Sequence, residues 1–237
     1  MKTLCFIRRL LGRPSAVDGT EILGACDRAA LESALALSGP EDEVVAIALG
    51  KSRRQDRALK LALSLGCGRA IRIYDQNLDQ LDAAGVATVL AASARHVGFD
   101  VIVCGDRSQD WATGAVGPMM AEILGLPALS GVRETSRTAE GLQARIRHGG
   151  RELRFQVQPP ALLTVRSAHV PEAARKPATA ATIEILDLKT IDLSPSLLRK
   201  HMGKNQVART RKESATLFRS ADALVERLTN EGLWPAT

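Results

Sequence analysis

A polar loop between Gly105 and Thr113 holds the residues best placed to do chemistry in this 237-residue chain. It follows the apolar segment Val101–Cys104 and leads into a predicted helix over Thr113–Leu124. Where a strand passes into a helix through such a loop, backbone N–H groups stay unpaired beside the positive end of the helix dipole. That junction suits an anion such as a phosphate. An ordinary strand-to-helix turn has the same local pattern, so the loop alone leaves both interpretations open.

The composition is that of a globular protein, with 45% hydrophobic and 24% charged residues. Aromatic residues make up only 3%, which argues against a stacking surface for single-stranded nucleic acid. The net charge of +6 permits an acidic partner, but the basic residues are dispersed apart from small groups near Lys51 and Arg209. We therefore expect no nucleic-acid partner.

Cysteine usage and hydropathy indicate the compartment. The four cysteines stand far apart without a C-x-x-C pair, so neither a metal site nor a disulfide framework is expected. No apolar stretch reaches the length of a membrane span, and the apolar run at the N-terminus is too short for a signal peptide. These features predict a cytoplasmic protein without membrane insertion.

In the first two-thirds of the chain, short apolar segments alternate with longer amphipathic ones. Strands are predicted at Thr3–Arg8, Glu43–Leu49, Ala70–Tyr74 and Asp100–Cys104. Helices are predicted at Ala25–Leu37, Arg53–Leu65, Gly85–Val97 and Thr113–Leu124. This order predicts an α/β fold whose parallel sheet is covered on both faces. Right-handed crossovers bring the loops after the strands to one edge, where a ligand crevice is expected.

The pattern changes after about residue 126. Added antiparallel strands form a predicted hairpin around Gly149-Gly150, with strands at Glu140–His148 and Arg151–Val157. Two further strands are predicted at Ala161–Val165 and Thr182–Leu188, and a C-terminal helix is predicted at Glu213–Glu231. A basic, extended connector precedes the helix. We expect an α/β nucleotide-binding domain over 1–190 and an extended C-terminal arm over 191–237. The apolar stripe of the arm's helix either contacts a partner subunit or packs on its own domain.

The segment from Gly105 to Met119 resembles the signature loop of the electron transfer flavoprotein beta subunit family, which reads G-K-Q-A-I-D-x-D-T-x-Q-V-G-P-M. The likeness continues in segments that occur in the family's order and spacing: the first strand ending in Arg8-Arg9, residues 43–50, 58–69, 160–165, 183–186 and 223–232. The chain thus resembles a divergent member of that family.

The resemblance implies the adenine-nucleotide-binding α/β fold of the HUP or Rossmann-like type. It also implies a heterodimer with an alpha subunit that carries FAD, while the beta subunit holds AMP. The pair is expected to take electrons from a flavin-dependent dehydrogenase and to pass them to a quinone oxidoreductase. Because the redox chemistry belongs to the flavin, the chain is expected to be an electron-carrier subunit without catalytic turnover, and its four histidines share no spacing. The cofactor-binding positions that the resemblance implies are Phe6, Leu23, Leu49, Gly105, Asp106, Arg107, Asp110, Thr113, Gly114, Ala115 and Val116.

Departures from the family pattern concentrate at the nucleotide site. Ala112 and Ala115 stand where relatives have Asp and Gln, and Phe6 stands where they have Ala. The Asn of the family's N-P-F/Y-D-E turn is also missing from the segment that begins at Leu23. We therefore expect nucleotide binding that is weakened or altered, with AMP as the best single ligand.

The loop that the family uses for partner recognition is several residues shorter here. Val170 takes the place of the family's anchoring Leu and is followed by Pro171. A shorter loop with a smaller anchor predicts a different, dedicated dehydrogenase, unless Val170 packs locally and has no partner role. Two further functions stay open: a free-standing nucleotide-binding α/β module, and an electron-bifurcating type of subunit with its own FAD.

Overall fold

A computed structural model describes residues 1–8, 23–51, 53–108, 112–166, 182–203, 218 and 220–233. They form two compact units, one over 1–203 and one over 204–237. The first unit extends past residue 190, because Ile191, Leu193 and Leu198 lie buried in its core. No helix in the described part of the chain is long and apolar enough to cross a membrane.

The first unit is built on a nine-stranded sheet with the order β7-β6-β5-β8-β4-β1-β2-β3-β9. Its central strands are β1 (Lys2–Phe6), β2 (Glu43–Leu49), β3 (Arg69–Tyr74), β4 (Val101–Gly105) and β8 (Ala161–Val165), and β9 (Ile183–Asp187) forms one edge. These strands all pair in parallel, and Phe6 lies in register with Ile47 on one side and Cys104 on the other. The predicted α/β fold with a parallel sheet is confirmed.

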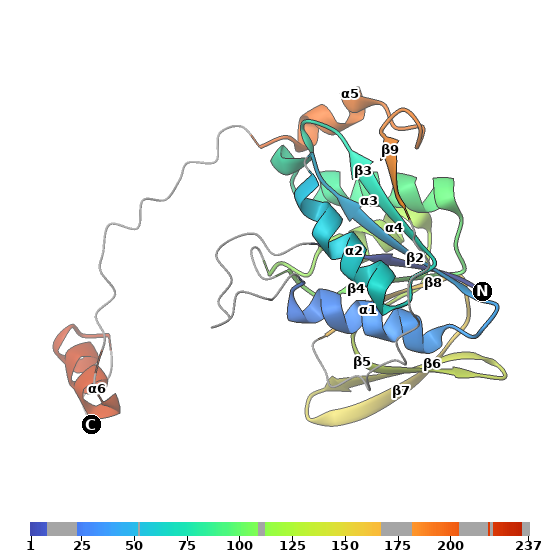
Figure 1. Cartoon of the computed structure of the whole chain (residues 1–237). Helices are drawn as coiled ribbons and strands as arrows, with labels where there is room; N and C mark the ends of the chain where they lie inside the picture. The colour runs from blue at the N-terminus through green and yellow to red at the C-terminus, as the bar shows by residue number, and fades with distance from the viewer. Residues whose placement is uncertain are drawn as a thin grey trace. The chain divides into compact units, whose positions relative to one another are not determined.

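Helices cover both faces of the parallel strands (Figure 1). Side chains alternate between the faces of a strand, so neighbouring residues of β1 enter different core layers. Cys5 packs with α1 (Ala25–Leu37) and α2 (Asp56–Leu65), while Leu4 packs with α3 (Ala83–Val97) and α4 (Val116–Leu124). The crossover connections thus leave the loops after the strands at one edge of the sheet.

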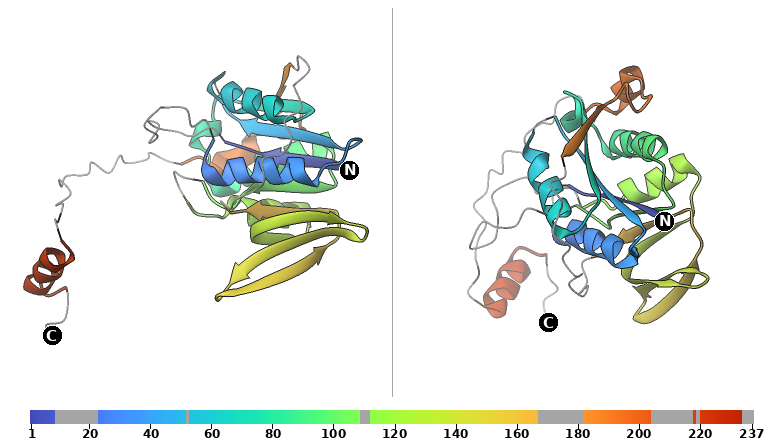
Figure 2. Two further views of the ribbon diagram at one scale, coloured as in Figure 1. Left: turned by 60° about the horizontal axis from the view of Figure 1, so that its bottom comes forward. Right: turned by 45° about the vertical axis from the view of Figure 1, so that its right-hand side comes forward.

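Three strands extend the sheet beyond β8 and run below α1 in Figure 1, and Figure 2 shows them from two other sides. They are β5 (Ala128–Thr138), β6 (Gly141–His148) and β7 (Arg151–Val157). The β6–β7 hairpin turns through Gly149 and Gly150, both with positive φ, which confirms the predicted hairpin. β5 was not expected from the sequence. It pairs in parallel with β8 and then antiparallel with β6, with a register shift at each pairing.

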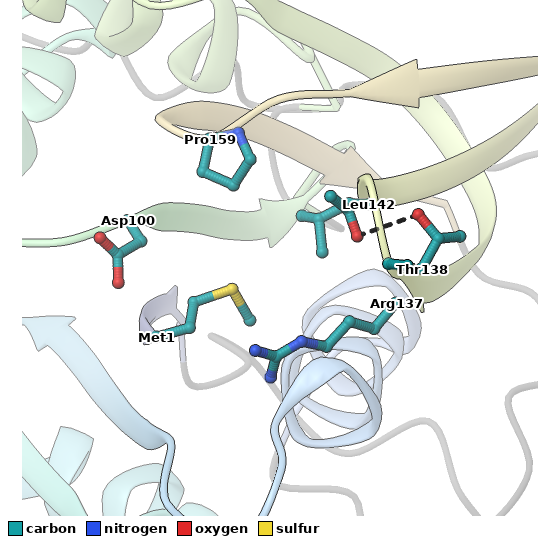
Figure 3. Close-up of a pocket in the computed structure, with 8 residues that line it drawn as sticks. Met1, Asp100, Arg137, Thr138, Leu142 and Pro159 are labelled. Atoms are coloured by element: carbon teal, nitrogen blue, oxygen red, sulfur yellow. Dashed lines mark hydrogen bonds between the residues drawn. The ribbon is translucent and has the colours of Figure 1, made fainter.

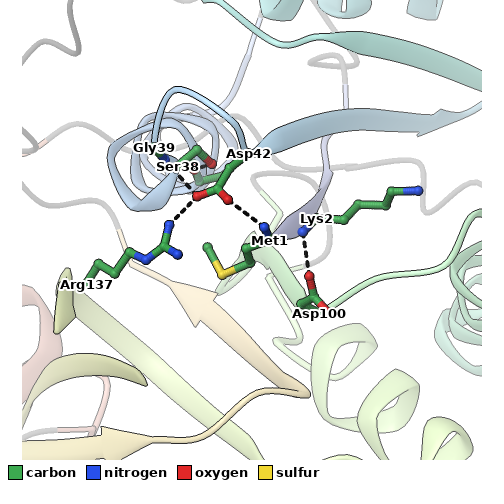
Figure 4. A network of polar contacts seen from close by, with 8 residues as sticks. Met1, Lys2, Ser38, Gly39, Asp42, Asp100 and Arg137 are labelled. Carbon is green, nitrogen blue, oxygen red and sulfur yellow. Dashed lines mark hydrogen bonds and ion pairs between the residues drawn. The ribbon is translucent and has the colours of Figure 1, made fainter. Parts of the chain in front are cut away.

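A polar network connects β5 of this extension to the edge of the sheet at which the parallel strands begin (Figure 4). The Asp42 carboxylate accepts hydrogen bonds from the Met1 ammonium at 2.5 Å and from the Gly39 amide at 2.8 Å, and it pairs with Arg137 of β5. The hydrogen bond from the terminal ammonium, followed by that from Gly39, lowers the pKa of Asp42 to about 2. A pocket of about 310 Å³ lies beside it, lined by Met1, Asp100, Arg137 and Pro159 among others (Figure 3).

The remaining elements lie toward the C-terminus. Short helix α5 (Pro195–Leu198) belongs to the first unit, and α6 (Ala221–Asn230) belongs to the second. Ser220 caps α6 by accepting a hydrogen bond from the Ala223 amide at 3.2 Å, so the helix begins later than the predicted residue 213. None of the residues of α6 is buried, and Leu224 and Val225 are exposed.

Candidate functional site

The candidate site lies at the carboxyl edge of the sheet, where β1, β4 and β8 end side by side. Gly105 pairs with Val165 at the ends of β4 and β8, and the Asp106 amide donates to the Val165 carbonyl at 2.7 Å. The loop that follows β4 therefore starts from a fixed point between two buried strands. In open parallel sheets, ligands bind at this edge.

Gly105 lets the start of α1 approach the end of β4. A Cβ atom at this position would lie 3.1 Å from Asp27 Oδ1 and 3.1 Å from Cys26 Cβ, both in the first turn of α1. The Asp27 carboxylate suits the positive end of the α1 dipole. The helix that approaches β4 thus brings an acidic side chain close to the end of that strand.

The loop before α4 turns through two left-handed residues. Ala112 has φ 50° and Gly114 has φ 65°, and the Thr113 hydroxyl accepts a hydrogen bond from the Ala115 amide at 3.4 Å. Helix α4 then starts at Val116, later than the predicted residue 113, because positive φ angles are incompatible with a right-handed helix. The third helical position contributes no amide donor, since it is Pro118.

The first turn of α4 leaves the amides of Val116 and Gly117 without intrahelical acceptors, as at every helix start. Gly117 also packs directly on the sheet, because a Cβ there would lie 2.5 Å from Thr164 Cγ2 and 3.3 Å from Cys104 Sγ. The helix start is therefore held firmly against β4 and β8. It offers two aligned amides to an anion at a fixed place.

Asp106 connects several parts of the site. Asp106 is 8% exposed, and its carboxylate accepts a hydrogen bond from the Thr164 hydroxyl at 3.0 Å. Arg166 Nε and Arg107 Nε lie 3.2 Å and 3.4 Å from its Oδ2 atom. A carboxylate with these partners is already engaged by the protein, so Asp106 belongs to the site's scaffold.

The apolar positions that the resemblance implied fall into two layers. Phe6, Leu49 and Val116 all pack on the α3–α4 side, whereas Leu23 packs on the α1–α2 side. Phe6 is only 4% exposed and contributes to the core beside Ile47. The structure therefore places Phe6 beneath the carboxyl edge rather than on its surface.

The buried thiols at this edge are poor nucleophiles. Burial, with smaller contributions from the carboxylates of Asp27 and Asp106, raises the pKa of Cys104 to about 12. The pKa of Cys5 is raised well above its usual value, again chiefly by burial. Among the described residues, no group of three His, Cys, Asp or Glu side chains could hold a metal ion.

Thr164, Arg166 and Arg72 are polar residues near the carboxyl edge whose contacts the sequence did not indicate. Arg72 of β3 is 4% exposed, forms an ion pair with Asp56 at 2.9 Å, and lies 3.5 Å from the Gly50 carbonyl. It anchors the connection from β2 to α2. The only available signal was a charged residue, Arg72, within the otherwise apolar segment Ala70–Tyr74.

A comparison with protein-family models matches residues 16–191 to the electron transfer flavoprotein domain, which is more than half of the chain. The chain belongs to the electron transfer flavoprotein family. Proteins with this domain are flavin-associated and act in general as electron carriers that exchange electrons with protein partners such as dehydrogenases. The matched residues include every strand of the sheet except β1.

The electron transfer flavoprotein fold brings seven predicted site residues together at the carboxyl edge. These residues are Gly105, Asp106, Arg107, Thr113, Gly114, Ala115 and Val116. Three others, Asp110, Val170 and Pro171, lie outside the described residues. The assignment of these positions to nucleotide binding and partner recognition remains a prediction.

Proposed function

We propose that this chain is the beta-type subunit of a heterodimeric electron transfer flavoprotein. In this proposal the alpha-type subunit carries most or all of the FAD, a flavin-dependent dehydrogenase supplies electrons, and a quinone oxidoreductase accepts them. The observation that carries the proposal is the family match over residues 16–191 on a sheet whose carboxyl edge ends in an anion-compatible loop. The four free cysteines support a reducing, cytoplasmic compartment.

We propose that the loop before α4 holds the phosphate of AMP. The main-chain geometry supports this role, because the amides of Val116 and Gly117 are aligned and Gly114 leaves room beside the Asp106 carbonyl. A Cβ at Gly114 would lie 3.2 Å from that carbonyl oxygen, and its φ of 65° also favours glycine. Arg107, whose side chain is 51% exposed, supplies a cation at the same loop. Because backbone amides supply the hydrogen-bond donors, phosphate binding does not need the polar side chains that relatives carry at the positions of Ala112 and Ala115.

The C-terminal arm is proposed to contact the FAD-carrying subunit. Helix α6 has Leu224 and Leu228 four residues apart on one face, with Val225 beside them, while Glu226 and Arg227 lie elsewhere on its surface. A ten-residue helix with no buried residue in its own unit gains little stability by itself. Burial of its apolar stripe on another chain would supply that stability.

In the proposed heterodimer, FAD held by the alpha-type subunit would supply the one- and two-electron chemistry. This chain's own residues would then fix geometry and electrostatics rather than transfer protons. The raised pKa values of Cys5, Cys67 and Cys104 support that role, because these thiols stay protonated near neutral pH. No catalytic turnover of the subunit alone is proposed.

Co-expression of the full chain with an electron transfer flavoprotein alpha subunit from the same source tests the proposal. We expect a one-to-one complex that is yellow, contains one FAD and releases AMP on denaturation. Size-exclusion chromatography, flavin absorbance and mass spectrometry of the released small molecules measure these three properties. The chain expressed alone, with the same tag, is the matched control.

Each alternative gives a different outcome. A colourless, monodisperse monomer that ignores the alpha subunit would refute heterodimer membership and favour a free-standing nucleotide-binding module. Two flavins per heterodimer would instead identify a bifurcating type of subunit with its own FAD. A yellow one-to-one complex without any released nucleotide would remove the AMP site alone.

A further inference from the structure

Two arginines from different loops share one carboxylate oxygen of Asp106. Arg107 follows β4 and Arg166 follows β8, and both Nε atoms lie within 3.4 Å of Asp106 Oδ2. We propose that Asp106 is a positioning residue that holds Arg107 while the nucleotide site is empty and releases it to a bound phosphate. The inference rests on the proposed AMP site.

The two arginines differ in how firmly they are held. Arg107 lies 3.4 Å from the carboxylate, next to it in sequence, and its side chain is 51% exposed. Arg166 lies at 3.2 Å, and its side chain is 44% exposed. The Arg166 guanidinium also lies beside Gly131, where an added Cβ atom would stand 3.6 Å from Arg166 Nη2. Arg107 is thus the more exposed of the two partners, and it is the one on the nucleotide loop.

The other carboxylate oxygen reaches into the sheet. Asp106 Oδ1 accepts from the Thr164 hydroxyl at 3.0 Å, and that hydroxyl accepts in turn from the Gly131 amide at 3.1 Å. The Arg166 amide donates to the Val132 carbonyl at 2.8 Å. One carboxylate therefore joins the nucleotide loop to the ends of β8 and of the first part of β5.

Binding of a phosphate at the α4 start changes this balance. The anion attracts Arg107, so Asp106 loses one of its two cations and pairs more strongly with Arg166. The ends of β8 and β5 are then held more firmly than in the empty protein. By linkage, any partner that favours this firmer state would also raise the affinity for the nucleotide.

The proposal fixes the sign of a substitution effect. If Asp106 were a nucleotide ligand, Asp106→Asn would weaken AMP binding. Because Asp106 competes with the phosphate for Arg107, we expect Asp106→Asn to raise AMP affinity about two- to fivefold, in line with partly exposed ion pairs. In an Arg107→Gln background the same change should have no effect on affinity. Glu184→Gln, which removes an exposed carboxylate paired with Arg69, is the matched control.

Isothermal titration of AMP into the full-length chain in complex with its FAD-carrying subunit measures the affinities. Hydrogen–deuterium exchange of the amides of Gly131 and Arg166, with and without AMP, measures the link to β5 and β8. We expect AMP to slow this exchange in the wild type and to leave it unchanged in Asp106→Asn. Circular dichroism shows whether Asp106→Asn folds. If it does not, Arg166→Gln takes its place with the opposite expectation, a lower AMP affinity, because Asp106 would then hold Arg107 alone.

The possible results separate the two proposals. A wild-type complex that binds no AMP would overturn both the nucleotide site and the role of Asp106. AMP binding that is weakened by Asp106→Asn, or that responds equally in the Arg107→Gln background, would overturn the role of Asp106 alone. AMP binding that leaves hydrogen–deuterium exchange of the Gly131 and Arg166 amides unchanged would also overturn the role of Asp106 alone.

Discussion

Gly117 offers the sharpest test of how the candidate site is built. It lies in the first turn of α4, and a Cβ there would stand 2.5 Å from the γ-methyl group of Thr164. Real Cβ atoms do not approach carbon so closely, so Gly117→Ala must push the start of α4 away from β8. The two amides proposed to bind phosphate would move with it.

The expected cost follows from two opposing effects. Alanine is favoured over glycine in a helix by about 1 kcal/mol. Overpacking a close contact costs about 1–3 kcal/mol. We expect Gly117→Ala to lower the free energy of unfolding by up to about 2 kcal/mol, the difference between these two effects.

Thr164→Ser provides the rescue, because it removes the methyl group in the way and keeps the hydroxyl that binds Asp106 and the Gly131 amide. Alone, loss of this buried methyl should cost about 0.8 kcal/mol. In the double variant the methyl group added at position 117 fills the space of the one removed from Thr164. The stability of the double variant should therefore exceed the sum of the single effects by about 1–2 kcal/mol, as for residues in contact.

Urea unfolding of the full-length chain followed by circular dichroism gives the four free energies, and AMP titration shows whether the rescue restores binding. Strictly additive effects of Gly117→Ala and Thr164→Ser would refute the close contact between α4 and β8. A stabilised Gly117→Ala variant would refute it even more directly.

Two further predictions concern the nucleotide loop and the opposite edge of the sheet. Thr113→Pro should abolish AMP binding, because it removes the hydroxyl and forces Ala112 out of its left-handed conformation. The control variant Thr113→Ser should retain binding. Unchanged nucleotide content in the proline variant would place the site elsewhere. Since the folded-state pKa of Asp42 is about 2, below its usual 3.8, its carboxylate stabilises the fold above pH 3.8, and this contribution is lost as the pH falls toward 2. Asp42→Asn should remove about 1–2 kcal/mol of that pH-dependent stability, as urea unfolding between pH 2 and 5 would measure; an unchanged pH profile would contradict the assignment.

The elements predicted well from the sequence are those with one dominant environment. Helix α1 and strands β2, β7 and β8 have the predicted ends, because apolar periodicity or turn residues bound each of them. β5 was missed for a physical reason. It pairs with β8 and then with β6, contains Gly131 with φ 72°, and is mostly exposed, so no single periodicity runs through it.

The candidate site could be predicted as a set of positions but not as a set of contacts. The order of strand, loop and helix identified the region from Gly105 to Val116. The hydrogen bonds of Asp106 join residues 58 and 60 positions apart, and no local pattern encodes them. The family resemblance placed Phe6 at the nucleotide, and the structure adds that Phe6 lies in the α3–α4 core; its part in nucleotide binding stays a prediction.

Ala112 shows how the loop can keep its shape after losing a polar side chain. Its φ of 50° is a conformation that Asp and Asn adopt more readily than Ala, and the family pattern has Asp at this position. An alanine held there stores about 1–2 kcal/mol of backbone strain. The surrounding contacts must supply that energy, including the hydrogen bond from the Ala112 amide to the Ser108 carbonyl at 3.1 Å. The main-chain path is thus maintained against the preference of the residue in it, as expected if the backbone amides, and not the lost carboxylate, do the binding.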